Sequence, residues 1–239
     1  MARSQSSGGT KVPESSLTEL CVGAILKLIR TGQVAVGSRL GEVALAKRLK
    51  MGRAPVRAAL DRLASMGVVE RIARSGTFVR EFQITDYCEI IDVRAGLEGM
   101  AGYLATNRIT DDELDHLNKV ATELDRIDAK AMPEGMTRDA IYKHFDRIFA
   151  LDFLFHMSIA RICGNKRITA LIEQQHLLER SFIIGIGFPV RTERALLVAP
   201  SHKDIVAALR KRNPSFVRDT IQTSLQGTKE RVIRRFSGF

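Results

Sequence analysis

The sequence has no apolar run that approaches the roughly 20 residues needed to cross a membrane. Residues 1–13 are rich in serine, glycine and basic side chains and contain no apolar stretch typical of a secretory signal. The three cysteines, Cys21, Cys88 and Cys163, are odd in number and lie among apolar neighbours, which argues against disulfides or a thiolate metal site. We therefore expect a disordered N-terminal tail, reduced thiols, no membrane partner and a cytoplasmic location.

Two motifs of enzyme chemistry are also missing. The sequence has no HExxH pattern of zinc proteases and no glycine-rich phosphate loop. Its charge is unevenly distributed instead: residues 1–80 hold 14 Lys and Arg against 5 Asp and Glu, whereas residues 81–239 hold 23 against 22. A basic excess confined to one segment is typical of a module that neutralises DNA phosphates. The simpler alternative is a nonspecific basic surface.

Residues 41–79 have the order of a winged helix-turn-helix, in which a short helix, a tight turn, a basic second helix and a β-hairpin follow one another. The second helix, over 53–63, would turn Val56, Leu60 and Leu63 toward a core. Arginines on its other side could donate paired hydrogen bonds from their planar guanidinium groups to guanine or phosphate. A glycine at the hairpin turn would allow close approach to the DNA backbone. The candidate DNA-binding residues are Arg53, Ala54, Arg57, Arg62, Arg74 and Gly76.

From residue 82 onward the sequence shows long helical periodicities and no convincing strand pair. Thr110 and Glu113 form a predicted capping box at the start of one helix. The expected fold is therefore mostly α, with a winged helix-turn-helix domain over 14–81 and an all-α antiparallel bundle over 82–239. Helices are expected over about 84–107, 110–129, 138–163, 168–184, 191–211 and 214–236.

Asp152 and His156 are four residues apart, which places both side chains on one face of a helix, as two ligands of one metal ion require. His202, on a later helix, could complete the set. The alternative for such a histidine is an ordinary partly buried residue paired with an acid.

Four ordered segments of the first domain resemble the DNA-binding domain of GntR-family transcriptional regulators: GEVALAKRL (41–49), RAPVRAALDRL (53–63), GVVER (67–71) and SGTFV (75–79). The family commonly has Ser and Thr on either side of the first arginine of the recognition helix, where this chain has Gly52 and Ala54. The resemblance implies a double-stranded DNA operator and a homodimer. Two-fold pairing would also lengthen the DNA site, because one winged helix reads few base pairs.

The segments LDFLFHMSIA (151–160), GNK (164–166) and SHKDIVAAL (201–209) are similar to the FCD domain, the helical effector domain of FadR-type GntR regulators. This similarity implies a divalent metal at Asp152, His156 and His202, with the family's fourth ligand position at Ser224, a poor metal ligand. Three such donors suit zinc, nickel, manganese or iron.

The same resemblance implies a small carboxylic acid as effector, clamped by Arg94. His176, on another amphipathic helix, would face the same cavity. For Arg94 the alternative is an ion pair with Glu98, one helical turn away.

The sequence therefore predicts a sequence-specific transcriptional regulator, more specifically a repressor, and not an enzyme. Two other classes of function remain as alternatives. One is a metal-dependent hydrolase-type enzyme in which Asp152, His156 and His202 hold a catalytic ion, and the other is a nucleoid-type protein that binds DNA by charge alone.

Overall fold

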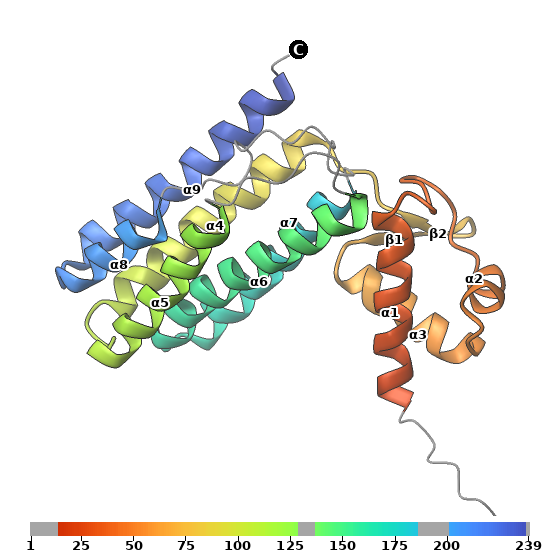
Figure 1. Ribbon diagram of the computed structural model, residues 1–239, viewed down its shortest axis with the longest axis horizontal. Helices are drawn as coiled ribbons and strands as arrows, with labels where there is room; N and C mark the ends of the chain where they lie inside the picture. The colour runs from red at the N-terminus through yellow and green to blue at the C-terminus, as the bar shows by residue number, and fades with distance from the viewer. Residues whose placement is uncertain (1–13, 129–136, 186–200, 238–239) are drawn as a thin grey trace, which may run out of the picture. The chain divides into compact units, whose positions relative to one another are not determined.

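The computed structural model describes residues 14–128, 137–185 and 201–237 (Figure 1). The chain divides into two compact units, of which the first ends at Arg80 and the second begins at Glu81. The tail predicted over residues 1–13 lies outside the described residues. In the described part of the chain, none of the helices combines the length and apolar character needed to cross a bilayer.

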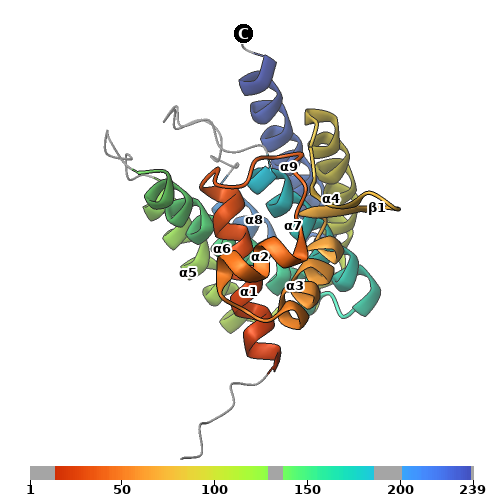
Figure 2. The ribbon, with the colours of Figure 1, turned by 90° about the vertical axis from the view of Figure 1, so that its right-hand side faces the viewer.

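The first unit contains the helices α1 (Glu14–Arg30), α2 (Glu42–Leu49) and α3 (Arg53–Ser65) and the strands β1 (Val69–Ile72) and β2 (Gly76–Val79). Helix α3 packs against α1, α2 and β1, and Figure 2 shows the three helices together. As predicted, Val56, Leu60 and Leu63 of α3 are fully buried. Each such side chain contributes about 1.5–3 kcal/mol through its burial, which fixes the face that α3 leaves exposed.

The two strands form the predicted antiparallel hairpin, with Val69 opposite Val79 and Ile72 opposite Gly76. Its turn spans residues 73–75, and Gly76 is the first residue of β2. Arg39 adds an isolated bridge to Phe78. The hairpin is thus the wing of a winged helix-turn-helix.

The second unit is a helical bundle of α4 (Ile84–Ala105), α5 (Asp111–Asp128), α6 (Arg138–Ile162), α7 (Lys166–Gly185), α8 (His202–Arg210) and α9 (Pro214–Ser237). Helix α4 packs against α6, α7 and α9, while α5 packs against α6 and α8. The capping box predicted for α5 is present: the Thr110 backbone N–H donates to Glu113 at 2.8 Å, and the Glu113 N–H donates to the Thr110 hydroxyl at 3.2 Å.

One helix differs from the sequence prediction. The expected helix over 191–211 is wrong as a continuous element, because α8 begins at His202. Ser201 is its N-cap, with ψ at 125° and a hydroxyl that accepts a hydrogen bond from the Asp204 N–H at 3.2 Å. Residues 191–200 lie outside the described residues.

A glycine allows α4 and α9 to approach each other closely. A Cβ atom at Gly102 would overlap Ile221 Cδ1 and lie 3.0 Å from Val217 Cγ1, both on α9 and both buried. We expect Gly102→Val to lower the free energy of unfolding by about 1–3 kcal/mol through overpacking. Urea unfolding followed by circular dichroism measures this.

Gly96, also on α4, is the matched control, because a Cβ there meets no atom within 4 Å. Gly96→Ala should keep or raise stability, by up to about 1 kcal/mol from helix propensity. Equal stability of Gly102→Val and the parent chain would show that α4 and α9 pack differently from this structure.

Candidate functional site

The exposed face of α3 carries the arginines that the sequence singled out for DNA. Gly52 is the N-cap of this helix, and Arg53 and Ala54 follow in its exposed first turn. Because the opposite face is fixed in the core, Arg53 and Arg57 project from a helix of the size that fits the major groove of B-DNA.

Arg57 is held by a carboxylate of the preceding helix. Its Nε lies 3.1 Å and its Nη2 3.0 Å from Glu42 Oε2 on α2. The hydrogen bonds and charge of Arg57 lower the pKa of Glu42, so that carboxyl is ionised at neutral pH. This contact orients the guanidinium while it stays exposed, but an exposed pair of this kind adds little to stability.

Arg62 has a different setting. Its Nη1 contacts Glu19 Oε1 on α1, so its guanidinium bridges α3 and α1. This is the behaviour of an ordinary surface ion pair, and a DNA contact by Arg62 remains a prediction.

At the wing, Arg74 has a φ of 62° and lies in the exposed turn, while Gly76 has a φ of 122°. Sequence reasoning missed Arg39, whose side chain covers this glycine: a Cβ at Gly76 would lie 2.8 Å from Arg39 Nε. Arg39 pairs with Phe78 of the wing, a contact that joins residues far apart in the sequence and that no local pattern indicates. The positive φ at Gly76 favours a glycine there, and the Arg39 guanidinium lies directly above it.

Inside the helical unit, seven polar side chains gather in an otherwise apolar core. They come from four helices: Arg94 and Glu98 from α4, Asp152 and His156 from α6, His176 and Glu179 from α7, and His202 from α8. Burial of charged groups is costly unless they are paired or hold an ion, so this cluster marks a site.

Arg94 is the positive centre of this cluster and is only 2% exposed. Its Nε donates to Glu98 Oε1 at 2.6 Å, and its Nη1 donates to Glu179 Oε2. Its Nη2 lies 3.2 Å from His176 Nε2 and 3.8 Å from Asp152 Oδ2. The ion pair with Glu98, which was the alternative for this arginine, is therefore present. Arg94 and His176 lie together, and an effector contact by either residue stays a prediction.

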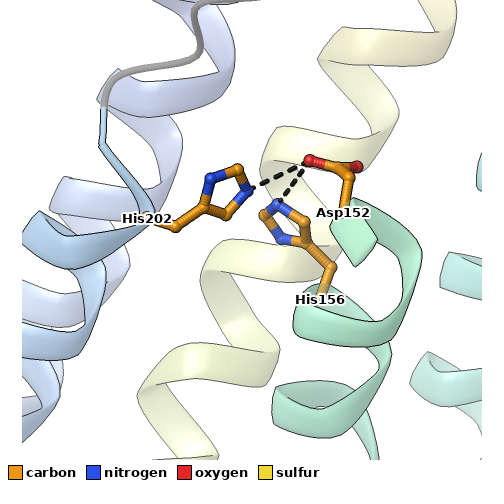
Figure 3. Close-up of side chains that lie close together, drawn as sticks. All are labelled: Asp152, His156 and His202. Carbon is orange, nitrogen blue, oxygen red and sulfur yellow. Dashed lines mark hydrogen bonds and ion pairs between the residues drawn. The ribbon is translucent and has the colours of Figure 1, made fainter. Parts of the chain in front are cut away.

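Asp152, His156 and His202 converge on one point (Figure 3). Asp152 Oδ1 lies 3.1 Å from His202 Nε2 and 3.6 Å from His156 Nε2, and one potential ligand atom from each residue lies within 4.8 Å of the other two. Ligand atoms at about 2.0–2.1 Å from an ion are separated by about 2.9–3.4 Å in octahedral or tetrahedral geometry. The Asp152–His202 separation lies within this range and the Asp152–His156 separation is slightly longer, so the three side chains would have to draw together by a few tenths of an ångström or more to hold one ion.

The surroundings of His156 favour a cation at this point. Its Nδ1 lies 2.6 Å from Glu98 Oε2, while its Nε2 faces Asp152. Burial alone would lower the pKa of His156, but the carboxylates of Glu98 and Asp152 outweigh burial and raise it to about 10. Arg94 and His156 hold the pKa of Glu98 well below its usual range despite burial, and His156 and His202 do the same for the pKa of Asp152.

Glu98 has the place of an outer-shell partner for a metal-binding histidine. A carboxylate on one ring nitrogen fixes the orientation of the imidazole and directs the other nitrogen to the ion. Ser224, the fourth family position, is buried on α9, where its carbonyl accepts a hydrogen bond from the Thr228 hydroxyl at 3.2 Å. Its hydroxyl is a weak metal ligand, so the two histidines and Asp152 are the strong donors.

Glu179 was not predicted from the sequence, and Glu98 was considered only as an ion-pair partner of Arg94. Both were detectable in part, because Glu98 lies one helical turn from Arg94 and Glu179 lies one turn from His176. His116 is exposed on α5, and His144 packs against Phe145 away from this cluster.

A winged helix-turn-helix joined to a helical domain with a buried polar site defines a ligand-responsive DNA-binding regulator. The sequence profile of the FCD domain matches residues 89–227, and that of the gntR family of bacterial regulatory proteins matches residues 17–79. The chain therefore belongs to the GntR family of regulators with a C-terminal FCD domain.

Two solved structures share the fold. McbR/YncC of Escherichia coli has a TM-score of 0.65 and 21% identity, covering 92% of this chain and 99% of its own. Lar of Listeria monocytogenes, which controls expression of the agr system and mediates virulence, has a TM-score of 0.59 and 17% identity, covering 91% and 97%. A search among curated proteins finds no significant match.

Family membership settles the class of function. The protein is a DNA-binding transcriptional regulator with a C-terminal effector-binding domain, and it is not an enzyme. The hydrolase alternative for Asp152, His156 and His202 is thereby excluded, and some members of the family bind metals in their FCD domains. Because GntR-family regulators bind DNA operators, family membership also argues against the nucleoid-type alternative.

Proposed function

We propose that the protein represses transcription from a two-fold symmetric operator, to which it binds as a homodimer, and that a small carboxylic acid bound in the FCD domain relieves repression. The observation that carries this proposal is the buried Arg94 guanidinium beside the converging group of Asp152, His156 and His202. Such a site offers both a positive charge and ligands for an ion to an acid that enters the bundle.

The DNA contacts proposed for α3 rest on Arg53 and Arg57, with Ala54 in the same first turn and Arg74 and Gly76 at the wing. If Arg57 reads a base or clamps a phosphate, Arg57→Ala should weaken binding to the preferred operator by roughly 5- to 150-fold. Fluorescence anisotropy with a labelled operator duplex, at fixed salt, measures the change.

Arg210→Ala provides the matched control. Arg210 is also an exposed helical arginine held by a carboxylate, with Nη2 2.9 Å from Asp115 Oδ1, but it lies in the helical unit. Its replacement should leave operator affinity unchanged. Equal affinity of the Arg57→Ala variant and the parent chain would remove Arg57 from the DNA-binding surface.

For the FCD domain we propose a divalent ion on Asp152, His156 and His202. Two imidazoles and one carboxylate suit zinc, nickel, manganese or iron, and the remaining coordination positions would be open to water or effector. When bound, the ion supplies positive charge for an oxygen of the acid. The ion would also replace the proton on His156 and balance the three carboxylates of the cluster, Glu98, Asp152 and Glu179.

The effector-binding residues we propose are Arg94 and His176, which lie in contact at 3.2 Å. An acid that binds better to one arrangement of the dimer than to the other shifts the population between them, and operator affinity changes accordingly. The size of the response is limited by that difference in affinity.

The homodimer has a candidate surface on α4. Val93, Met100 and Tyr103 lie along one side of this helix with exposed fractions of 47%, 44% and 38%. Their spacing of seven and three residues places them on one face of the helix, which a second copy of the chain would cover in a two-fold interface. Two copies are also what a two-fold symmetric operator requires.

Met100→Glu should therefore shift the protein from dimer to monomer, because a two-fold interface would place one charged glutamate from each copy in the apolar contact. Light scattering coupled to size-exclusion chromatography measures the mass. Met66→Glu, at a partly exposed position just after α3, is the control and should keep the mass of the parent chain. A dimer that persists in Met100→Glu at micromolar concentration would place the interface elsewhere.

A further inference from the structure

Tyr87 and Arg94 direct donors at the same carboxylate. Arg94 Nη1 donates to Glu179 Oε2, and the Tyr87 hydroxyl donates to Glu179 Oε1 at 3.5 Å. Tyr87 is 2% exposed, and its ring packs 5.0 Å from that of Phe182. Burial and the neighbouring Glu179 carboxylate hold the pKa of Tyr87 well above its usual value, so the phenol stays protonated and remains a donor.

A guanidinium and a phenol that each donate to one oxygen of a carboxylate form a typical binding place for a free acid. In this structure that place, which we call the carboxylate seat, is taken by a side chain of the protein itself. Glu179 belongs to α7, whereas both donors belong to α4. The seat is therefore formed by one helix and filled by another.

Of the two carboxylates that accept hydrogen bonds from Arg94, Glu179 has fewer polar partners among the described residues. Glu98 contacts Arg94 at 2.6 Å, His156 at 2.6 Å and His176 at 3.3 Å, and its side chain is 3% exposed. The contacts found for Glu179 are the one to Arg94 and the long hydrogen bond from Tyr87, and its side chain is 9% exposed. Displacement of Glu179 from Arg94 by another carboxylate would thus break fewer interactions than displacement of Glu98.

We propose that Glu179 is an internal occupant of the carboxylate seat formed by Tyr87 and Arg94, and that the carboxylate of the effector enters this seat by displacing it. This inference rests on the proposed function, because it specifies how a small acid reaches Arg94. It adds Tyr87 as a binding residue and makes Glu179 a determinant of affinity. Displacement also releases a contact between α4 and α7, which gives the acid a structural effect within the bundle.

Chemical rescue tests the proposal, with sodium acetate as the probe. Glu179→Ala removes the internal carboxylate and leaves the seat free, so acetate should raise the melting temperature of this variant in a saturable manner. In the parent chain the same response should need at least roughly tenfold more acetate, because acetate must compete with a charge-assisted hydrogen bond. Sodium chloride at equal concentration corrects for ionic strength.

Glu123→Ala is the matched control. Glu123 also pairs with arginines, at 2.7 Å from both Arg126 Nε and Arg147 Nη2, but both guanidinium groups are mostly exposed. Acetate should not rescue this variant, because water already satisfies these donors. Addition of Tyr87→Phe to Glu179→Ala should weaken the rescue, since it removes one donor of the seat.

Should Glu179→Ala fail to fold, Glu179→Gln is the second variant: its uncharged amide fills the seat but is held less strongly by Arg94, so acetate should displace it at a lower concentration than it displaces Glu179 in the parent chain. A folded Glu179 variant that responds to acetate no better than the parent chain would overturn the inference. The proposed function is tested separately, by the effect of carboxylic acids on operator binding of the parent chain. If acetate rescues the variant but carboxylic acids do not change operator binding of the parent chain, the acid effector is contradicted and the carboxylate seat is retained. If carboxylic acids change operator binding but acetate does not rescue the variant, only the carboxylate seat is contradicted.

Discussion

Replacement of Arg94 by Met is expected to lower the free energy of unfolding of the helical domain by about 3–5 kcal/mol. Arg94 is the only arginine in contact with Glu98 and Glu179 among the described residues, and Glu98 is almost fully buried. Without the guanidinium, two carboxylates remain close together in the bundle core with one positive partner less. Urea unfolding monitored by circular dichroism, with purified Arg94→Met and the parent chain, measures the loss.

The double variant Arg94→Met, Glu179→Gln separates this explanation from loss of packing. If stranded charge causes the instability, removal of one carboxylate should recover part of it, and the two substitutions will not be additive. If the double variant is less stable than Arg94→Met alone, loss of packing around the arginine is the cause. An Arg94→Met variant as stable as the parent chain would contradict the ion-pair account of the cluster.

Replacement of His156 by Ala should abolish metal binding by the FCD domain. His156 supplies one of the three strong donors, and it is the ligand that Glu98 orients through the other ring nitrogen. Elemental analysis after dialysis against zinc, nickel or manganese, and titration of the same ions by calorimetry, measure stoichiometry and affinity. The helical domain should also lose stability, because Glu98 loses a cationic partner.

His116→Ala is the control for this experiment, since His116 is exposed on α5 and should leave metal content unchanged. Glu98→Gln should give an intermediate result, with affinity reduced roughly 10- to 100-fold, as is usual when the outer partner of a ligating histidine is changed. Full metal occupancy in His156→Ala would exclude the proposed site.

The DNA-binding module was largely predictable from the sequence because local patterns specify it. The spacing of Val56, Leu60 and Leu63 gave the buried face of α3, and the glycine near the turn indicated the hairpin. Helix starts with side-chain caps were also readable, as with Thr110 and Glu113. Such signals act over a few residues, so they do not depend on the tertiary fold.

The polar cluster was predictable only in part, because its contacts join residues that are far apart in the sequence. The spacing of Asp152 and His156 placed both on one face of α6, but only the packing of four helices brings Glu179 to Arg94, 85 residues away. Arg39 was missed for the same reason, since its position over Gly76 depends on pairing with the wing. The start of α8 at His202 was predicted wrongly because the apolar periodicity of the sequence continues on both sides of Ser201. In the structure Ser201 is the N-cap of α8, so the helix begins only after it.

Selection of random DNA duplexes by the purified protein tests whether it is a dimeric regulator of one specific operator. We expect a two-fold symmetric consensus, bound at least about a thousandfold more tightly than random DNA at physiological salt. Titrations at several salt concentrations separate the phosphate contribution from base recognition. Recovery of no consensus, with similar affinity for all duplexes, would contradict a dimeric regulator that reads its operator through α3.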